Sequence, residues 1–416
     1  MINKHKIAII GLGYVGLPLA VIFSRKYKII GFDINNERVD QLKQGKDINN
    51  EVLSSDIISQ SIIYTSNLKR VKSCNIFIIT VPTPLGNNKK PDLSILFETT
   101  KMIASCLCRN DIVIYESTVY PGVTEEECVP ILEEISKLVY NKDFFCGYSP
   151  ERISPGQNQK KIEDIVKLVS GSNSKTTTLI DKLYKSVIQE GTYRTSSIKI
   201  AEASKLVENT QRDVNIALIN ELAMMFDVMN INSSEVFEAA ETKWNFIEYK
   251  PGLVGGHCIG VDPYYLTYKS EKIGFKPTLI LNSRQINNSI PFFIVDKTIK
   301  FLVKYNKPIK NATILILGYT FKEDCSDTRN TKIKVIIEGL EEYCCKIYVY
   351  DPLIRKNHTN FIKNPFNQDK KYDAIIVAVS HQDFFKYKKR DYEKISNGKL
   401  ILLDIKGIVK NATWKF

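Results

Sequence analysis

Residues 251–263 gather glycines around a single thiol, that of Cys258. Because glycine has no side chain, backbone N–H groups and a substrate carbon can come close to the sulfur atom. Such a thiol is a candidate nucleophile for covalent catalysis. The other cysteines lack this setting, and we expect them to be buried small side chains or surface thiols. His257 precedes Cys258, but adjacent residues of an extended segment point to opposite sides, which disfavours a Cys–His dyad.

A second pattern, Gly11-Leu-Gly13-Tyr-Val-Gly16, stands between an apolar run and a helix-like segment. In this context the first glycine permits a tight turn, the second lets the backbone approach a pyrophosphate, and the third allows close packing of helix on strand. Asp33 follows the next apolar run, where a carboxylate can bind an adenosine ribose and repel a 2′-phosphate. The pattern therefore predicts a dinucleotide site that favours NAD over NADP. Arg38 leaves alternatives open, since it could accommodate a 2′-phosphate, stack on adenine or form a surface ion pair.

An NAD site combined with a catalytic thiol predicts oxidation at the aldehyde level. A thiohemiacetal would lose hydride to NAD, and the resulting thioester would be hydrolysed. Lys205 and Asn209 would share one face of a helix and could stabilise a developing oxyanion, although such a pair is equally typical of a solvated surface. Glu116, Thr118 and Glu151 lie near expected strand ends, where the sites of open α/β sheets form, and are candidate water-handling groups.

Two series of short apolar runs rich in β-branched residues are typical of buried parallel strands. The first series covers residues 6–10, 28–32, 75–81 and 112–116, and the second covers 312–317, 346–350, 373–379 and 399–404. Helix-like segments separate the runs, which indicates βαβ units. Between the two series, residues 198–230 contain no Pro or Gly and predict a helix about 50 Å long. The chain is therefore expected to be an α/β protein with two Rossmann-like, doubly wound parallel-sheet domains joined by a long central helix.

The first strand of the second series ends in Gly318, a lone glycine where a dinucleotide fingerprint needs three. We therefore expect this domain to have lost dinucleotide binding. Lys322 and Arg329 could instead hold another phosphorylated ligand, or they could be ordinary surface residues.

Of the 416 residues, 44% are hydrophobic and 25% are charged, which is typical of a globular protein. No apolar run predicts a membrane span, and the N-terminus lacks the zones of a signal peptide, so we expect a cytoplasmic protein. The formal charge of +12 could attract nucleic acid, but the basic residues are scattered, which favours a solvated basic surface. With nine cysteines, four histidines and no C-x-x-C pair, we expect neither a disulfide framework nor a metal site.

Six motifs, in this order, closely resemble those of the nucleotide-sugar 6-dehydrogenases, the UDP-glucose/GDP-mannose dehydrogenase family, over essentially the full chain. They are Gly11-Leu-Gly-Tyr-Val-Gly16-Leu-Pro-Leu, Glu116-Ser-Thr118-Val-Tyr-Pro-Gly, Ser149-Pro-Glu151-Arg, Ala201-Glu-Ala-Ser-Lys205-Leu-Val-Glu-Asn209, Gly255-Gly-His-Cys258 to Asp262, and Phe321-Lys322 to Asp327-Thr-Arg329. The resemblance implies an NAD-binding Rossmann domain at 1–196, a central helical region for dimerisation and catalysis at 197–305, and a UDP-sugar-binding Rossmann-like domain at 306–416. It also implies four-electron oxidation of the sugar C6 alcohol to a carboxylate, with two NAD per turnover and no release of the aldehyde.

The resemblance further implies a role for each matching residue. Cys258 would form the thiohemiacetal and the thioester, and Asp262 would assist as a partner in base or water activation. Lys205 and Asn209 would stabilise the oxyanion. The implied catalytic set is Cys258, Lys205, Asn209, Asp262, Thr118 and Glu151, of which the last two would handle water and the thioester. The implied NAD contacts are Gly11, Gly13, Tyr14, Val15, Gly16, Asp33, Arg38, Thr83, Thr118 and Arg329. The implied substrate contacts are Glu151, Arg152, Lys205, Asn209, Lys250, Gly255 and Lys322.

Two departures from the UDP-glucose branch of the family bear on the substrate. A glutamate-containing pattern after Pro-Glu is replaced by Arg152-Ile-Ser-Pro155-Gly156, and the lysine usual before the motif's Asp is Val261. The motifs instead resemble the dehydrogenases that act on UDP-N-acetylhexosamines, with N-acetylglucosamine or its galactosamine epimer, in the synthesis of capsule or O-antigen. UDP-glucose 6-dehydrogenase is the main alternative. A non-enzymatic basic protein that binds nucleotides or nucleic acid is a remote one.

Overall fold

The computed structural model describes residues 5–49, 51–58, 61–152, 161–354 and 360–416. The chain forms two compact units. The N-terminal unit comprises Met1–Glu208 and Tyr264–Phe275, and the C-terminal unit comprises Asn209–Pro263 and Lys276–Phe416. Helix α8 (Ile198–Val228) contributes residues to both units.

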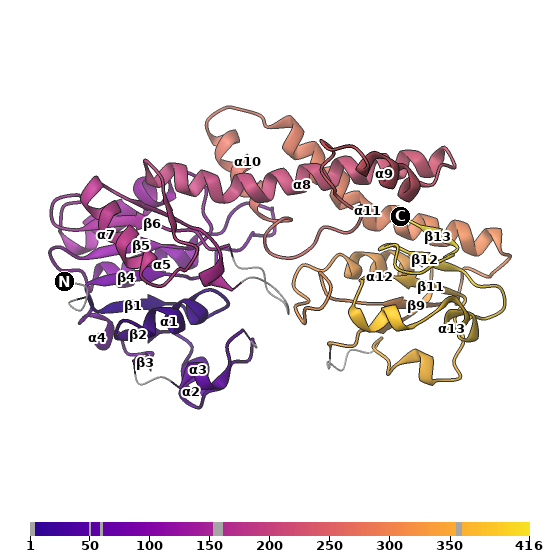
Figure 1. The fold of residues 1–416 in the computed structure, drawn as a ribbon, viewed down its shortest axis with the longest axis horizontal. Coiled ribbons are helices and arrows are strands. Elements are labelled where there is room, and N and C mark those ends of the chain that lie inside the picture. The colour runs from indigo at the N-terminus through magenta and orange to yellow at the C-terminus, as the bar shows by residue number, and fades with distance from the viewer. Residues whose placement is uncertain (1–4, 50, 59–60, 153–160, 355–359) are drawn as a thin grey trace. The chain divides into compact units, whose positions relative to one another are not determined.

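Within the described residues, the N-terminal unit contains an eight-stranded sheet in the order β3-β2-β1-β4-β5-β6-β7-β8 (Figure 1). Neighbouring strands are parallel, except that β6 and β7 are antiparallel. Ile7 of β1 is paired with Ile29 on one side and with Ile76 on the other. Most of the strands are apolar and buried, as expected for a sheet covered on both faces. Their bounds are β1 Ile7–Ile10, β2 Ile29–Phe32, β3 Ile62–Thr65, β4 Ile76–Ile79, β5 Ile112–Tyr115, β6 Phe145–Tyr148, β7 Lys167–Gly171 and β8 Thr192–Arg194.

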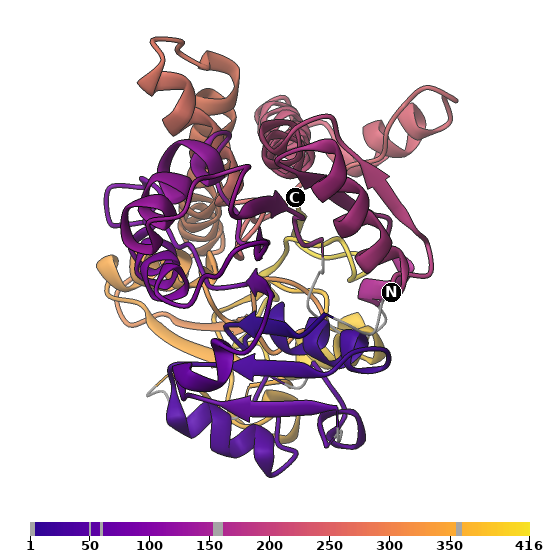
Figure 2. The same cartoon turned by 90° about the vertical axis from the view of Figure 1, so that its left-hand side faces the viewer.

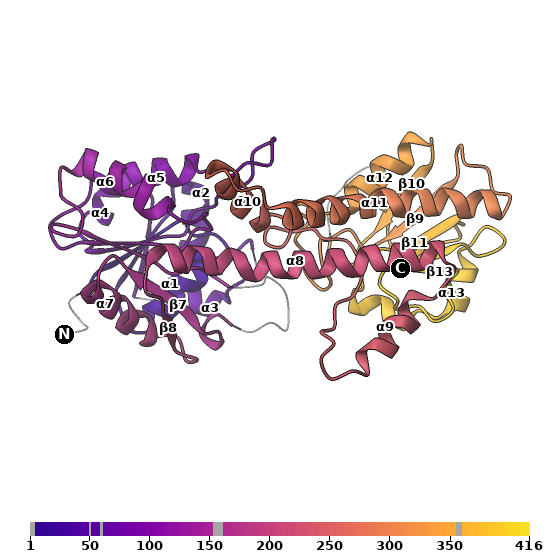
Figure 3. The ribbon, with the colours of Figure 1, turned by 90° about the horizontal axis from the view of Figure 1, so that it is seen from above.

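Helices cover both faces of this sheet (Figures 2 and 3). On one face, α1 and α7 pack together, and the rings of Phe23 and Tyr184 meet edge to face with their centroids 5.4 Å apart. Helices α5 and α6 lie on the opposite face. The helices of this unit are α1 Gly16–Ser24, α2 Asn36–Lys43, α3 Ser54–Ile57, α4 Leu68–Val71, α5 Ser94–Ala104, α6 Val129–Ser136, α7 Ser174–Lys185 and most of α10 Asp262–Lys272.

The C-terminal unit contains a sheet in the order β10-β9-β11-β12-β13, in which every described pair is parallel. Helix α11 packs against α12. A Cβ added to Gly339 of α12 would lie 3.0 Å from Cγ2 of Val295 on α11. The strands are β9 Thr313–Leu317, β10 Lys346–Tyr350, β11 Ala374–Val377, β12 Leu402–Asp404 and β13 Trp414–Lys415. The helices include α9 Ser233–Glu241, α11 Thr278–Lys304, α12 Ile333–Glu342 and α13 Lys389–Lys394.

The predicted fold class is confirmed. Each predicted apolar run contains a strand, and the predicted helix at 198–230 is α8. Strands β3, β6, β7, β8 and β13 were not predicted, and the antiparallel pairing of β7 departs from the expected parallel order. Among the described residues, none of the helices combines the length and the apolar character that crossing a membrane requires.

The glycine-rich turn between β1 and α1 depends on close backbone packing. Gly11 has a φ of +93°, a conformation that side chains disfavour. At Gly16 a Cβ would lie 1.8 Å from the carbonyl oxygen of Gly11 and 2.4 Å from Thr80 Oγ1. At Gly13, by contrast, a Cβ would meet no described atom within 4 Å. Gly16 therefore serves the packing of the helix on the strand, whereas Gly13 borders open space.

These two glycines predict different outcomes for the same substitution. We expect Gly16→Ala to lower the free energy of unfolding by about 1–3 kcal/mol, because the added methyl group displaces backbone. Gly13→Ala should leave stability nearly unchanged and weaken dinucleotide binding, because its methyl group would occupy the open space. Urea unfolding and NAD titration of both variants measure the two effects, and equal losses of stability would contradict the assignment.

Candidate active site

The dinucleotide turn is held by hydrogen bonds from the strand that lies beside it. The Gly11 N–H donates to Phe32 O at 2.8 Å. The two oxygens of Asp33 accept from Leu12 N–H and Asn35 N–H, each at 2.9 Å. These bonds fix the carboxylate at the carboxyl end of β2, and its remaining lone pairs can accept ribose hydroxyls.

Arg38 is buried, so the interpretation that it forms a surface ion pair is wrong. Its side chain is buried, its Nε donates to Leu12 O at 2.9 Å, and its Nη2 pairs with the buried Asp47 at 2.8 Å. Arg38 lies in the first turn of helix α2, which Asn35 caps by accepting the Arg38 N–H. The guanidinium therefore supports the dinucleotide turn from inside the unit.

The turn fits an NAD pyrophosphate. No side-chain hydrogen bond caps the start of α1, and the N-terminus of this helix supplies positive potential at the turn, where an anion can bind. Val15 is the N-cap residue, and Tyr14 and Val15 are half-buried beside the exposed Gly13. Among the described residues, His, Cys, Asp and Glu form no group of three that could hold a metal ion.

Two further predicted cofactor residues, Thr83 and Thr118, meet at the carboxyl edge of the sheet. The Thr83 hydroxyl donates to Thr118 O at 2.6 Å. Tyr265, on α10, donates its hydroxyl to Thr83 O. Ser117, between Glu116 and Thr118, donates to Val81 O at 2.6 Å and fixes this segment to the loop after β4.

Glu151 and Arg152 follow β6 at the same edge. A buried lysine, Lys167, contacts Glu151 at 2.8 Å. Arg152 reaches α8, where its guanidinium donates to Ser204 O at 2.9 Å and to Lys205 O at 3.2 Å and pairs with Glu208. Arg152 is thus tied to the helix that carries the predicted oxyanion residues. The departures at Pro155 and Gly156 lie outside the described residues.

The segment around Cys258 forms turns, so its expected extended conformation is wrong. The Cys258 carbonyl accepts the N–H groups of Val261 at 3.0 Å and Asp262 at 2.9 Å. These bonds form the turn that leads into α10, which begins at Asp262. Cys258 is half-buried, while the ring of its neighbour His257 interacts electrostatically with Arg329 and Asp327. Burial and the Arg329 charge lower the pKa of His257, which favours a neutral imidazole. Among the other cysteines, six are buried and two are exposed, and all are free thiols.

Asn209 and Asp262, both predicted catalytic residues, are in contact within the C-terminal unit. The Asn209 amide donates to Asp262 Oδ2 at 2.6 Å, and both side chains are almost fully buried. Lys205 is likewise buried and stands one turn earlier on α8. These residues are therefore not the solvated helix pair that their types alone would allow.

A cavity in the C-terminal unit brings predicted substrate residues together with two unpredicted lysines. Its lining includes Gly255, Lys322, Lys332 and Lys406. Burial, the largest effect, lowers the pKa of Lys406. The cavity itself is only about 10 Å³, but several cations close together favour the binding of an anionic group beside them. Lys406 follows β12 as Lys322 follows β9. Its position just after a predicted strand could therefore have marked Lys406 as a candidate binding residue from the sequence.

The remaining predicted contacts are nearer to solvent. Lys250 is exposed and pairs with Glu248 at 3.2 Å. Arg329 forms a two-pronged ion pair with Asp327, in which Nη2 lies 2.6 Å from Oδ2. Burial would raise the pKa of Asp327, but the hydrogen bonds and charge of Arg329 outweigh it and lower the pKa. Arg329 thus holds the end of the Lys322 segment in place.

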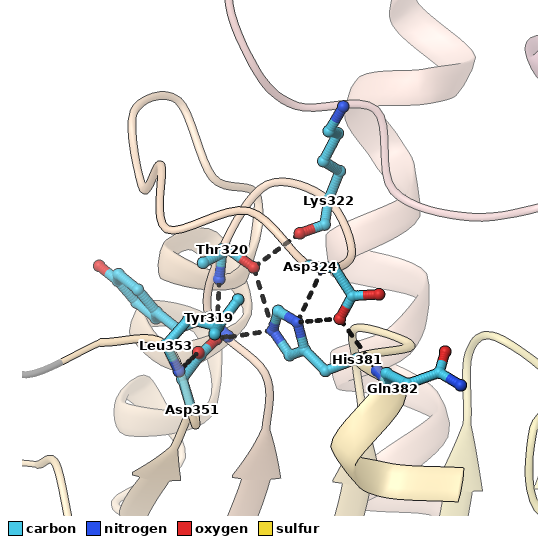
Figure 4. Close-up of polar contacts among 8 residues, drawn as sticks. All are labelled: Tyr319, Thr320, Lys322, Asp324, Asp351, Leu353, His381 and Gln382. Carbon is cyan, nitrogen blue, oxygen red and sulfur yellow. Dashed lines mark hydrogen bonds and ion pairs between the residues drawn. The ribbon is translucent and has the colours of Figure 1, made fainter. Parts of the chain in front are cut away.

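A buried histidine organises the loop that carries Lys322 (Figure 4). The Asp324 N–H donates to His381 Nδ1 at 3.0 Å, so this nitrogen carries no proton. His381 Nε2 therefore carries the proton and lies 3.0 Å from Asp351 Oδ2 and 3.1 Å from Thr320 Oγ1. The Thr320 hydroxyl donates onward to Lys322 O at 2.8 Å. One imidazole thus joins the loops after β9, β10 and β11.

Asp351 directly follows β10 as Asp33 directly follows β2, but its carboxylate has different partners. Backbone N–H groups of Tyr319 and Leu353 donate to it at 2.7 and 2.9 Å, in addition to His381. Burial would raise the pKa of Asp351, but these hydrogen bonds outweigh it and lower the pKa. Because the carboxylate is buried and saturated, it cannot bind a ribose, in agreement with the predicted loss of dinucleotide binding here.

Comparison with known proteins agrees with this geometry. Three family models match residues 5–188, 199–289 and 315–411, and they describe the NAD binding domain, the central domain and the UDP binding domain of the UDP-glucose/GDP-mannose dehydrogenase family. The UDP-N-acetyl-D-glucosamine 6-dehydrogenase of Salmonella typhi is 46% identical over 98% of this chain and 97% of its own. Protein CapL of Staphylococcus aureus is 48% identical over 98% of this chain and 97% of its own. The structure of a UDP-D-ManNAc dehydrogenase from Pyrococcus horikoshii, 32% identical, has a TM-score of 0.90 and covers 99% of this chain and 98% of that one.

The fold, the dinucleotide turn and these matches define an NAD-dependent nucleotide-sugar dehydrogenase. The chain belongs to the UDP-glucose/GDP-mannose dehydrogenase family, and its cofactor is NAD.

The His381 network generates a prediction about nucleotide binding. We expect His381→Leu to raise the dissociation constant for UDP about tenfold or more, because Asp324 N–H and Asp351 lose their shared partner and the Lys322 loop loses its anchor. Isothermal titration with UDP measures this change. The neighbouring Gln382 is an appropriate control, since its exposed side chain lies outside the network and Gln382→Ala keeps the backbone N–H bond to Asp324. Equal UDP affinity in the two variants would refute the role.

Proposed function

We propose that this protein is a UDP-N-acetylglucosamine 6-dehydrogenase that oxidises the sugar C6 hydroxyl to a carboxylate with two NAD. The observation that carries the choice of sugar is the 46% identity to the Salmonella typhi enzyme of that name across nearly both full chains. The UDP-D-ManNAc dehydrogenase structure is more distant, at 32%. UDP-N-acetylgalactosamine is the second candidate substrate, because the sequence motifs do not distinguish the two C4 epimers.

The proposed mechanism assigns the chemistry to this chain's own residues. When bound, NAD accepts the hydride removed from C6 in each oxidation step. Cys258 adds to the aldehyde as a thiolate to form a thiohemiacetal. Loss of a second hydride from C6 of this thiohemiacetal leaves a thioester on the sulfur. Lys205 and the Asn209 amide stabilise the oxyanion of these tetrahedral species. The contact between Asn209 and Asp262 supports this role, because Asp262 fixes the amide orientation and can accept a proton.

Hydrolysis of the thioester is assigned to the N-terminal unit's Thr118 and Glu151, which handle the attacking water. Retention of the aldehyde as a covalent adduct follows from the thiol, because the intermediate stays bound between the two oxidations. The similarity to CapL supports a role in capsule synthesis, and we infer that the enzyme works in the cytoplasm, where NAD and UDP-sugars are present.

The stoichiometry of NADH tests this function. We expect two NADH per molecule of limiting UDP-N-acetylglucosamine, measured by absorbance at exhaustion of the sugar, with UDP-N-acetylgalactosamine and UDP-glucose assayed separately. Cys258→Ala should lower kcat by on the order of 10³-fold or more, because the covalent route is lost. Cys108→Ala, at an exposed thiol, is the matched control. Turnover of UDP-glucose alone would overturn the substrate, and release of free aldehyde as the main product would overturn the mechanism.

We also propose that the enzyme is a homodimer that pairs through α8. Four apolar side chains of this helix are 42–55% exposed, namely Ile200, Val207, Leu218 and Met225. Their spacings of seven and eleven residues keep them within about 20° of one line along the helix. An exposed apolar stripe of this kind supports an interface with another copy of the helix.

The dimer proposal predicts that Leu218→Glu yields a monomer, because a charge in the centre of the stripe would be buried without a partner. Sedimentation velocity measures the change in mass. Val303→Glu, at an exposed apolar residue of α11, should leave the dimer intact. A monomeric parent protein, or a dimer that survives Leu218→Glu, would refute the proposal.

A further inference from the structure

Lys167 is a buried lysine that no part of the proposed mechanism uses. Its ammonium lies 2.7 Å from Glu116 Oε2 and 2.8 Å from Glu151 Oε2, and the side chains of all three residues are almost fully buried. Tyr184, on α7, donates its hydroxyl to the other oxygen of Glu116. The Lys167 ammonium also lies 5.7 Å from the centroid of the Tyr184 ring.

The direction of β7 explains why a lysine lies at this edge of the sheet. β7 is antiparallel to β6, with Tyr148 opposite Ser170, so the first residue of β7 lies where β6 ends. The Ser149 hydroxyl donates to Leu168 O at 2.7 Å and continues this pairing beyond the strand. A parallel β7 would place Lys167 at the amino edge, away from the residues that come after β5 and β6.

The electrostatics of the cluster keep Lys167 charged and directed at both carboxylates. Burial alone would lower the pKa of Lys167, but Glu116 and Glu151 outweigh burial and raise it. Burial and the neighbouring Glu116 raise the pKa of Tyr184 far above its usual value, so its hydroxyl remains a donor. Glu116 is therefore held by Tyr184 and Lys167 from two sides and anchors the lysine.

This anchored lysine contacts a predicted water-handling carboxylate. One oxygen of Glu151 accepts from Lys167, and the other accepts the Arg152 N–H at 2.5 Å. With both oxygens engaged, the carboxylate has one orientation, and a carboxylate held in this way can act as the acceptor of a proton from water. Replacing a buried ion cluster by apolar residues is often neutral or stabilising, so stability alone does not account for this arrangement.

We propose that Lys167 is a positioning residue that orients Glu151 for hydrolysis of the Cys258 thioester; this inference rests on the proposed function. In that step the oxygen of water bonds to the thioester carbonyl carbon, and one water proton passes to Glu151. The carbon–sulfur bond then breaks, its electron pair leaves with Cys258, and the sulfur takes the proton back from Glu151. The products are the sugar carboxylic acid and the free thiol, and no further oxidant is consumed.

The test separates oxidation from hydrolysis in a single experiment. Purified full-length Lys167→Met is mixed rapidly with NAD and UDP-N-acetylglucosamine, and NADH is followed by absorbance. The reaction is quenched with acid, and the mass of the protein is measured by mass spectrometry. We expect a first burst of NADH at nearly the parent rate, steady-state turnover reduced at least about tenfold, and a protein that carries the acyl group on Cys258. Lys167→Arg, which keeps the cation, should restore turnover to within about threefold and abolish this accumulation.

Controls keep the result interpretable. Lys185→Met removes an exposed lysine of α7 that pairs with Asp181, and it should change neither phase. If Lys167→Met gives no folded protein, Lys167→Gln provides the same test, because it keeps hydrogen-bonding capacity and loses the charge. Parallel loss of the burst and of turnover, without acyl-protein, would overturn the positioning role. Absence of NADH production by the parent protein with all three UDP-sugars would instead refute the proposed function.

Discussion

The carboxyl edges of the parallel sheets are the constraint on which both halves of the molecule depend. Parallel strands end at a common edge, so loops from distant parts of the sequence meet there. In the N-terminal unit, this edge carries the glycine turn after β1, Asp33 after β2, Thr83 after β4 and Thr118 after β5. In the C-terminal unit, the corresponding loops after β9, β10, β11 and β12 carry Lys322, Asp351, His381 and Lys406. Hydrophobic strands thus bring polar residues together that no local sequence pattern connects.

The antiparallel strand β7 adds a group that a purely parallel sheet could not supply. Its first residue, Lys167, lies at this edge, whereas β1, β2, β4, β5 and β6 run the other way and contribute residues from the loops beyond their carboxyl ends. The result is a lysine between two glutamates, all withdrawn from water. Burying charge costs free energy that mutual attraction only partly recovers, and clusters of this kind concentrate at functional sites. The reversed direction of β7, which β8 shares, is therefore a chemical feature of the unit as well as a topological one.

The sequence predicted the elements better than the contacts between them. Periodicity and the glycine spacing located β1, Asp33 and α8, because these signals are local. The position of Lys167 was not predictable, because it depends on the register of the antiparallel pair β6–β7. The sequence of β6, only four residues long, does not indicate the direction of its neighbour. Arg38 and Cys258 show a similar limit. The burial of Arg38 depends on where α2 folds back, and the turns around Cys258 depend on the start of α10.

The two sheets also show how one architecture is directed toward different ligands. Asp33 and Asp351 occupy the same place after the second strand of their units, yet only Asp33 is partly exposed beside an uncapped helix start. Asp351 is saturated by His381 and backbone donors, which stiffens the loop and removes it from ligand binding. The lysines around the adjacent cavity then provide the cationic surroundings that a phosphorylated ligand needs. The difference lies in a few loop residues, because the strands beneath them are alike and the chemistry of each edge is set by which polar groups the loops leave available.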